Sequence, residues 1–116
     1  MMVLERSIIE THDDYSFWRD INAGFDEDKN FVVEMGYVNY DDRESGGKTI
    51  AVVDCKEAYH LAHRNGVKLV ELPELIENKF GDSTGTALPS HVKEVFGRIL
   101  DFISSSGIRY TLKDIR

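Results

Sequence analysis

Two apolar segments joined by a polar turn constrain the fold of this chain most strongly. Residues 31–40 read FVVEMGYVNY and residues 48–54 read KTIAVVD, and both are rich in β-branched or aromatic residues that favour strands. The intervening DDRESGG is polar and ends in glycines, so the pair predicts an antiparallel hairpin. The unbroken run IAVV predicts a central strand covered on both faces. Gly36 suggests a bulge in the first strand.

The segment before this hairpin predicts one strand and one helix. Residues 2–9 are mostly aliphatic and β-branched, which is typical of a strand. Thr11 and Asp14 have the spacing of a capping box. They predict a helix over 13–23 that ends at Gly24.

The segment after the hairpin predicts alternating helices and strands. Asp54 and Glu57 have N-cap and N3 spacing for a helix over about 55–64, and residues 67–72 (VKLVEL) predict a strand. Proline is well placed in the first turn of a helix and glycine at its end. Three further elements follow, namely a short helix PELIENKF before Gly81, a helix from Pro89 to about Ser105, and a last strand over 108–112.

These elements predict an α/β chain of the α+β type. We expect a mixed β-sheet of about four or five strands with helices packed on it. A chain of 116 residues has room for one domain of ordinary size, so residues 1–116 are expected to form a single domain.

The charge and composition narrow the function classes. Fourteen basic against 21 acidic residues give a net charge of −7, which disfavours broad nucleic-acid binding because phosphate contacts need a basic surface. No stretch approaches the roughly 18 apolar residues of a membrane helix. The single cysteine, Cys55, cannot form an internal disulfide and fits a reducing compartment, so a cytoplasmic location is expected.

A set of acidic residues and one lysine suggests metal-dependent nuclease chemistry. Asp54 and Lys56 alternate, as in nucleases that hold a divalent ion and a water, and Glu34, Asp41 or Asp42 could supply the upstream acid. The alternative is structural, with Asp54 capping the next helix and Lys56 solvated in its first turn.

Two further polar sets are candidate binding sites. His60 and His63 share a helix face and could reach one metal, with Cys55 nearby, or could be two ordinary exposed histidines. Residues 81–85 (GDSTG) match the nucleophile-elbow pattern, but a helix precedes them, so a plain surface loop is favoured, with a phosphate-binding loop as the alternative. Its candidate ligand-binding residues are Ser83, Thr84 and Thr86. No cofactor is predicted.

Residues 50–76 resemble the C-terminal strand–helix–strand–helix of Mrr-type restriction-endonuclease-like domains. The matching positions are Ala58, Ala62, Gly66-Val67, Leu69-Val70 and Glu74-Leu75. A similar rhythm occurs near the end of bacterial ligase-type BRCT domains. The first resemblance implies a nuclease-like fold. It also places Asp54 on a later, non-catalytic strand, and no lysine follows Glu34 at the family's spacing.

The leading hypothesis is a small non-catalytic module that binds a protein partner or itself. The long last helix carries more apolar positions than one sheet face needs, so part of it is expected to form an interface. The predicted interface residues are Val92, Phe96, Ile99 and Ile103. The alternatives are a divergent metal-dependent nuclease and a domain that binds a small ligand or anion through residues 81–88.

Overall fold

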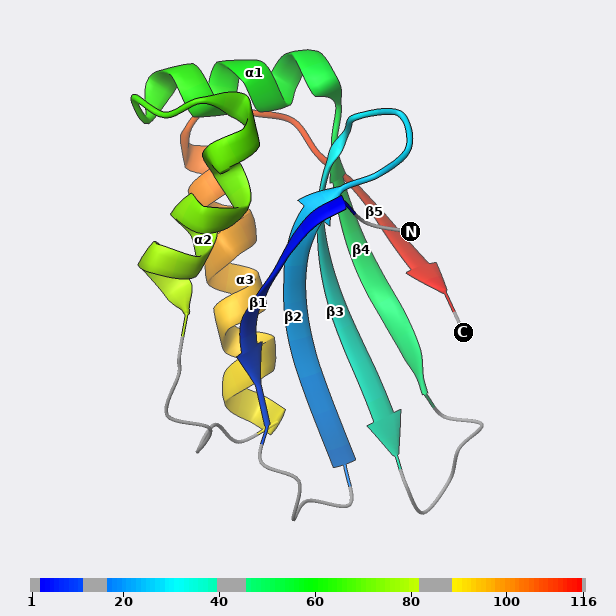
Figure 1. The fold of residues 1–116 in the computed structure, drawn as a ribbon. Helices are drawn as coiled ribbons and strands as arrows, with labels where there is room; N and C mark the ends of the chain where they lie inside the picture. Colours follow the sequence, from blue (N-terminus) through cyan, green and yellow to red (C-terminus); the bar gives the residue numbers. More distant parts are fainter. Residues whose placement is uncertain (1–2, 12–16, 40–45, 82–88, 116) are drawn as a thin grey trace.

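The computed structural model describes residues 3–11, 17–39, 46–81 and 89–115. Within these ranges the chain forms five β-strands, three α-helices and one short 3-10 helix (Figure 1). In chain order they are β1 (Val3–Glu10), β2 (Phe17–Phe25), β3 (Phe31–Asn39), β4 (Gly47–Val53), α1 (Cys55–Arg64), η2 (Leu69–Glu71), α2 (Leu72–Phe80), α3 (Pro89–Ser105) and β5 (Thr111–Ile115).

The described strands form one sheet in the order β1-β2-β3-β4-β5, and each neighbouring pair is antiparallel. The predicted hairpin is confirmed, with Phe31 opposite Val53 and Tyr37 opposite Gly47. The α+β class is confirmed as well. The sheet is not mixed, because the chain returns from α3 to the end of β4 and runs back along it, with Thr111 opposite Val52.

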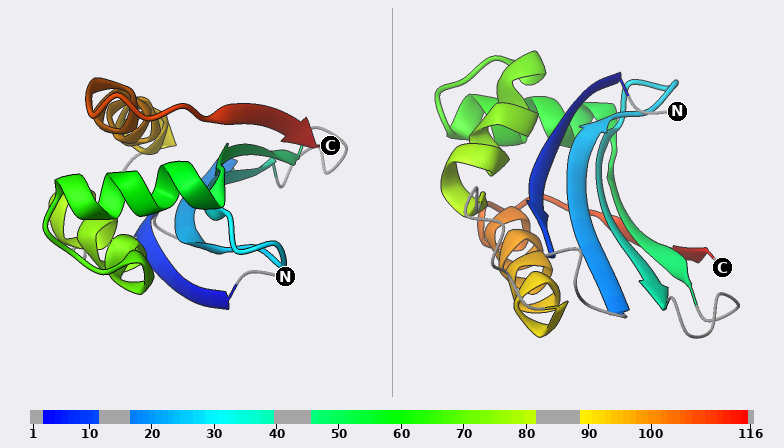
Figure 2. Two further views of the ribbon diagram at one scale, coloured as in Figure 1. Left: turned by 90° about the horizontal axis from the view of Figure 1, so that it is seen from above. Right: turned by 60° about the horizontal axis from the view of Figure 1, so that its bottom comes forward.

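All three α-helices lie on one side of the sheet (Figure 2). In Figure 1, α1 crosses one end of the sheet, while α2 and α3 run beside β1 and β2. We call the opposite side the helix-free face. None of the described helices is long and apolar enough to cross a membrane.

The core lies between the helices and alternate residues of the sheet. Side chains of a strand point alternately to its two faces, so every second residue of β2, β3 and β4 meets the helices. The sheet contributes Ile21, Ala23, Phe25, Phe31, Val33, Met35, Ala51 and Val53, all buried. The α1 side chains of Ala58 and Leu61 close one end of this core. Burial of this continuous apolar layer is what holds the sheet and helices together.

The predicted helix over 13–23 is wrong where the structure describes it, because residues 17–25 form β2. Ile21, Ala23 and Phe25 alternate along the core face, and the backbone of β2 pairs with both β1 and β3. Within the described residues, Thr11 pairs with Arg19 of β2. Its backbone N–H donates to the Arg19 carbonyl at 3.0 Å, and its hydroxyl accepts from the Arg19 N–H at 3.3 Å.

The predicted strand over 67–72 is also wrong. Leu69–Glu71 form a 3-10 turn, and the Glu71 carboxylate accepts a hydrogen bond from the Lys68 N–H at 2.8 Å. Leu72 is buried at the start of α2, and Pro73 follows it in the first helical turn. The three-residue spacing between Leu69 and Leu72 suits a helical turn that faces the core, whereas a regular strand would point these two side chains to opposite faces.

Other details of the sheet differ less from expectation. Gly36 marks no bulge, because the pairing of β3 with β2 and with β4 passes through it without a shift. The run IAVV is buried at Ala51 and Val53, while Ile50 and Val52 are half-buried on the helix-free face. The last strand begins at Thr111 rather than at residue 108.

Candidate functional site

The apolar residues of α3 predicted to form an interface lie inside the single chain. Val92, Phe96, Ile99 and Ile103 are each at most 5% exposed and belong to the core. The sequence reasoning underestimated how much of α3 the sheet and α2 would cover. These side chains are therefore not available to a second copy of the folded chain.

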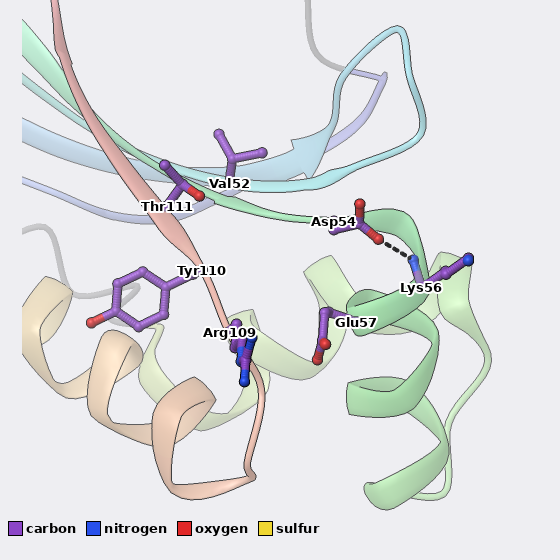
Figure 3. A pocket seen from close by; sticks show the side chains of 7 residues that line it. All are labelled: Val52, Asp54, Lys56, Glu57, Arg109, Tyr110 and Thr111. Carbon is purple, nitrogen blue, oxygen red and sulfur yellow. Dashed lines mark hydrogen bonds between the residues drawn. The ribbon is translucent and has the colours of Figure 1, made fainter.

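A pocket of about 300 Å³ opens where β4 passes into α1, beside the start of β5 (Figure 3). Its lining residues are Val52, Asp54, Lys56, Glu57, Arg109, Tyr110 and Thr111. In Figure 3 the Lys56 side chain points away from Glu57 and Arg109. Asp54, Lys56 and Arg109 place exposed charges of both signs around this pocket.

Asp54 is the N-cap of α1, as the structural alternative predicts. Its carboxylate accepts a hydrogen bond from the Lys56 N–H at 2.8 Å, as the dashed line in Figure 3 shows. The Ala58 N–H donates to the Asp54 carbonyl at 2.7 Å and begins the helix. The Cys55 N–H, at the first residue of α1, donates to the Asn30 side chain at 3.1 Å. This hydrogen bond ties the start of α1 to the turn between β2 and β3.

Replacing Asp54 with alanine should therefore weaken folding. The free energy of unfolding should fall by about 0.5–2 kcal/mol, because one helix N–H loses its partner. Urea denaturation followed by circular dichroism measures this loss. Asp54→Asn, which keeps an accepting oxygen, should recover most of it. An unchanged denaturation curve for Asp54→Ala would mean that the cap contributes nothing.

The two described acids proposed for nuclease chemistry, Glu34 and Asp54, do not lie together. Glu34 on β3 lies opposite Ile50, four residues before Asp54 along β4. Four residues of strand span roughly 13 Å, so the Glu34 and Asp54 carboxylates are not positioned to hold one ion. Asp41 and Asp42 lie outside the described residues.

A polar cluster that sequence reasoning missed lies on the helix-free face around Gly36. Asp20 on β2 and Lys48 on β4 both lie opposite Gly36. A Cβ at Gly36 would come within 2.6 Å of Asp20 Oδ1, so the missing side chain leaves room for this carboxylate. Asn22 donates to Asp20 Oδ2 at 3.0 Å, and Lys48 Nζ lies 4.0 Å from Glu34 Oε2. The signal was the pairing register, which a single sequence does not display.

Burial raises the pKa of the Asp20 carboxyl above its usual value, although hydrogen bonds from Asn22 and Gly36 and the charge of Lys48 act in the opposite direction. A raised pKa means that the folded state holds this proton more tightly than the unfolded state. The stability that Asp20 contributes is therefore complete below about pH 3.9, the ordinary carboxyl pKa, and is lost as the pH rises through the raised value.

Asp20→Asn removes this titration. Its free energy of unfolding, compared with that of the unaltered protein, should rise as the pH increases from about 4 toward neutrality. Urea denaturation at a series of pH values measures the difference, and Asp101→Asn on the exposed side of α3 is the control. A difference that stays constant with pH, or that falls, would contradict the shift.

The remaining candidates do not form a site within the described residues. His60 and His63 are exposed on α1, and the His63 ring stacks on Tyr59 with centroids 6.5 Å apart. No group of three or more potential metal ligands gathers anywhere in the described ranges. Ser83, Thr84 and Thr86 lie outside those ranges.

The two outer strands of the sheet differ in how regular their edges are. β1 has two register shifts against β2, a positive φ of 54° at Leu4, and contacts with α2 that include an Arg6–Glu77 ion pair at 3.5 Å. β5 pairs with β4 over five consecutive residues without a shift, and each of its residues is exposed. Irregular edges resist pairing with further strands, whereas a straight edge offers unpaired N–H and C=O groups.

We call the outer side of Thr111–Ile115 the β5 edge. Among the described strands, none pairs with this side. Leu112 and Ile115 are each 50% exposed there, on opposite faces of the strand. The helices cover Ala51 of β4 completely but do not extend over Leu112, its partner on β5. Within the described part of the chain, the β5 edge therefore combines backbone groups that pair with no further strand and exposed apolar side chains.

Comparisons with known proteins add no relative. The chain matches no protein family model, no curated protein and no solved structure.

Proposed function

We propose that this chain is a non-catalytic protein-interaction domain that binds an extended segment of a protein partner along the β5 edge. The observation that carries the proposal is the regular β5, whose residues are all exposed and which ends a sheet whose other edge is irregular and contacted by α2. An extended segment can add to such an edge by main-chain hydrogen bonds, while alternate side chains give specificity.

The surroundings of the β5 edge support a protein partner. The pocket beside Arg109 and Thr111 can receive a side chain of a segment that runs along β5. A net charge of −7 disfavours nucleic acid as the alternative partner. One cysteine fits a reducing compartment, so we place this binding in the cytoplasm.

Site-specific photocrosslinking in cells that make the protein tests the proposal. A photoreactive side chain is placed at Lys113 on β5 or, as a control, at Arg98 on the exposed side of α3. We expect a protein adduct from position 113 and none from position 98. Leu112→Lys places a charge on the edge and should abolish the adduct, because charged side chains discourage strand addition.

The matched control for this change is Val70→Lys. Val70 is 59% exposed on η2, close to the 50% of Leu112, and lies away from β5. It should leave the adduct intact. Equal adducts from positions 113 and 98, an adduct that survives Leu112→Lys, or no adduct from position 113 would each contradict the use of this edge.

A further inference from the structure

We infer that the segment that pairs with β5 is the β5 of a second copy of this chain, so that two sheets join into one. This inference rests on the proposed use of the β5 edge. Two identical edge strands can meet antiparallel about a two-fold axis perpendicular to the sheet. The helix-covered sides of both copies then lie on the same side of the joined sheet.

This symmetry leaves few registers. In an antiparallel pair, directly opposed side chains point to the same face of the sheet. The two-fold axis must therefore lie between one residue and the same residue of the other copy. We name each register by that residue. An axis at Lys113 opposes two lysines, and an axis at Asp114 opposes two aspartates. An axis at Thr111 opposes Lys113 and Arg109. Like charges placed directly opposite each other destabilise a strand pair.

An axis at Leu112 avoids these clashes. It opposes Leu112 with its own copy, Thr111 with Lys113, and Tyr110 with Asp114. Leu112 shares a face with Ala51, which is fully buried, so two opposed leucines would continue the apolar layer of the core across the axis. Pairing of the two leucines would explain why Leu112 is half exposed in a single copy.

The net charge of the β5 edge opposes such a pair less than the charge of the whole chain would. Residues 109–115 contain Arg109 and Lys113 against Asp114, which gives +1, while the whole chain carries −7. In the symmetric pair each β5 edge meets the β5 edge of the other copy, so a charge of only +1 faces +1 at the contact, and the acidic parts of the two chains lie away from it. Contact along one short strand buries less surface than a standard interface, so the dimer should be weak and dependent on concentration.

Cysteine crosslinking tests the register directly. In a Cys55→Ser background, Leu112→Cys should give a two-chain product with a short bismaleimide at high protein concentration. Asp114→Cys should give less, because the two residues 114 would lie four positions apart along the strands, about 13 Å. Val70→Cys, the matched exposed control, should also give less. Stronger product at Asp114 or Val70 than at Leu112 would overturn the inference.

Light scattering across a range of concentration keeps the test independent of cysteine chemistry. The unaltered protein and Val70→Lys should gain mass alike, and Leu112→Lys should need about tenfold more protein to do so, since one lost apolar pair replaced by opposed lysines is worth roughly that factor. A mass of one chain at every concentration would overturn the inference. If position 113 still captured a different protein, the proposed function would stand; no capture at all would contradict both.

Discussion

Truncating Ile99 to alanine should lower the free energy of unfolding by about 2–5 kcal/mol, the range for a large aliphatic side chain removed from a closed core. Ile99 is fully buried on α3, which packs against β2, and it belongs to the same cluster as Leu61 and Ile76. The lost contacts and the cavity left behind both contribute to the cost. Urea denaturation followed by circular dichroism measures it.

The same substitution separates a core position from an interface position. Lys93→Ala, on the exposed side of the same helix, is the control and should change the free energy by less than about 0.5 kcal/mol. Ile99→Ala should leave the concentration dependence of the molecular mass unchanged under conditions where the protein stays folded. If it instead weakened self-association and spared stability, α3 would be the interface after all.

Placing a charge at Ala23 should cost several kcal/mol and prevent stable folding. Ala23 is fully buried on the core face of β2, opposite Val33 of β3 and in the same cluster as Ile21. In Ala23→Asp the new carboxylate would lose its water without gaining a positive partner, and an uncompensated buried charge is strongly destabilising. Thermal unfolding followed by circular dichroism measures the effect.

The neighbouring residue is the matched control, because in a strand it points to the other face. Asn22 is half-buried on the helix-free face and donates one hydrogen bond to Asp20. Asn22→Ala should therefore cost only about 0.5–1.5 kcal/mol. A sharp difference between adjacent positions is the signature of a strand. Similar costs at both positions would contradict the assignment of β2.

The sequence pattern predicted those elements whose ends are marked by a local signal, such as a capping residue or a proline. Asp54 before α1, Pro73 within the first turn of α2, and Pro89 at the start of α3 each mark a helix start that the structure confirms. The hairpin of β3 and β4 followed from two β-branched segments and one polar turn. These signals act over a few residues, so they survive without knowledge of the tertiary fold.

The wrong predictions lie where one stretch of sequence fits both the periodicity of a helix and that of a strand. In β2, Phe17, Trp18 and Ile21 fit a helical stripe, while Ile21, Ala23 and Phe25 fit the alternation of a strand. Pairing with β1 and β3 on both sides decided between them, and that is a tertiary effect. At 67–72 the β-branched residues favoured a strand. The structure has a turn of 3-10 helix there, which leads into Leu72 and α2.

The candidate site was predicted less well than the fold, because it depends on strand order. Asp54 and Lys56 do line a pocket, yet the other side of that pocket, formed by Arg109, Tyr110 and Thr111, comes from a distant part of the sequence. The β5 edge exists because β5 has β4 as its single neighbour among the described strands, which no local pattern reveals. The long apolar stripe of α3 was readable in the sequence, but whether it was core or interface was not.

Hydrogen exchange of individual backbone amides at rising protein concentration tests the central claim most directly. In one copy the outward amides of β5 face solvent and exchange quickly, and pairing with a second strand gives them partners. Alternate amides within Thr111–Ile115 should gain protection as the concentration rises, while α3 and β1 stay unchanged. Protection that appears on α3 or β1 instead, or on no amide of β5, would contradict the binding role assigned to this edge.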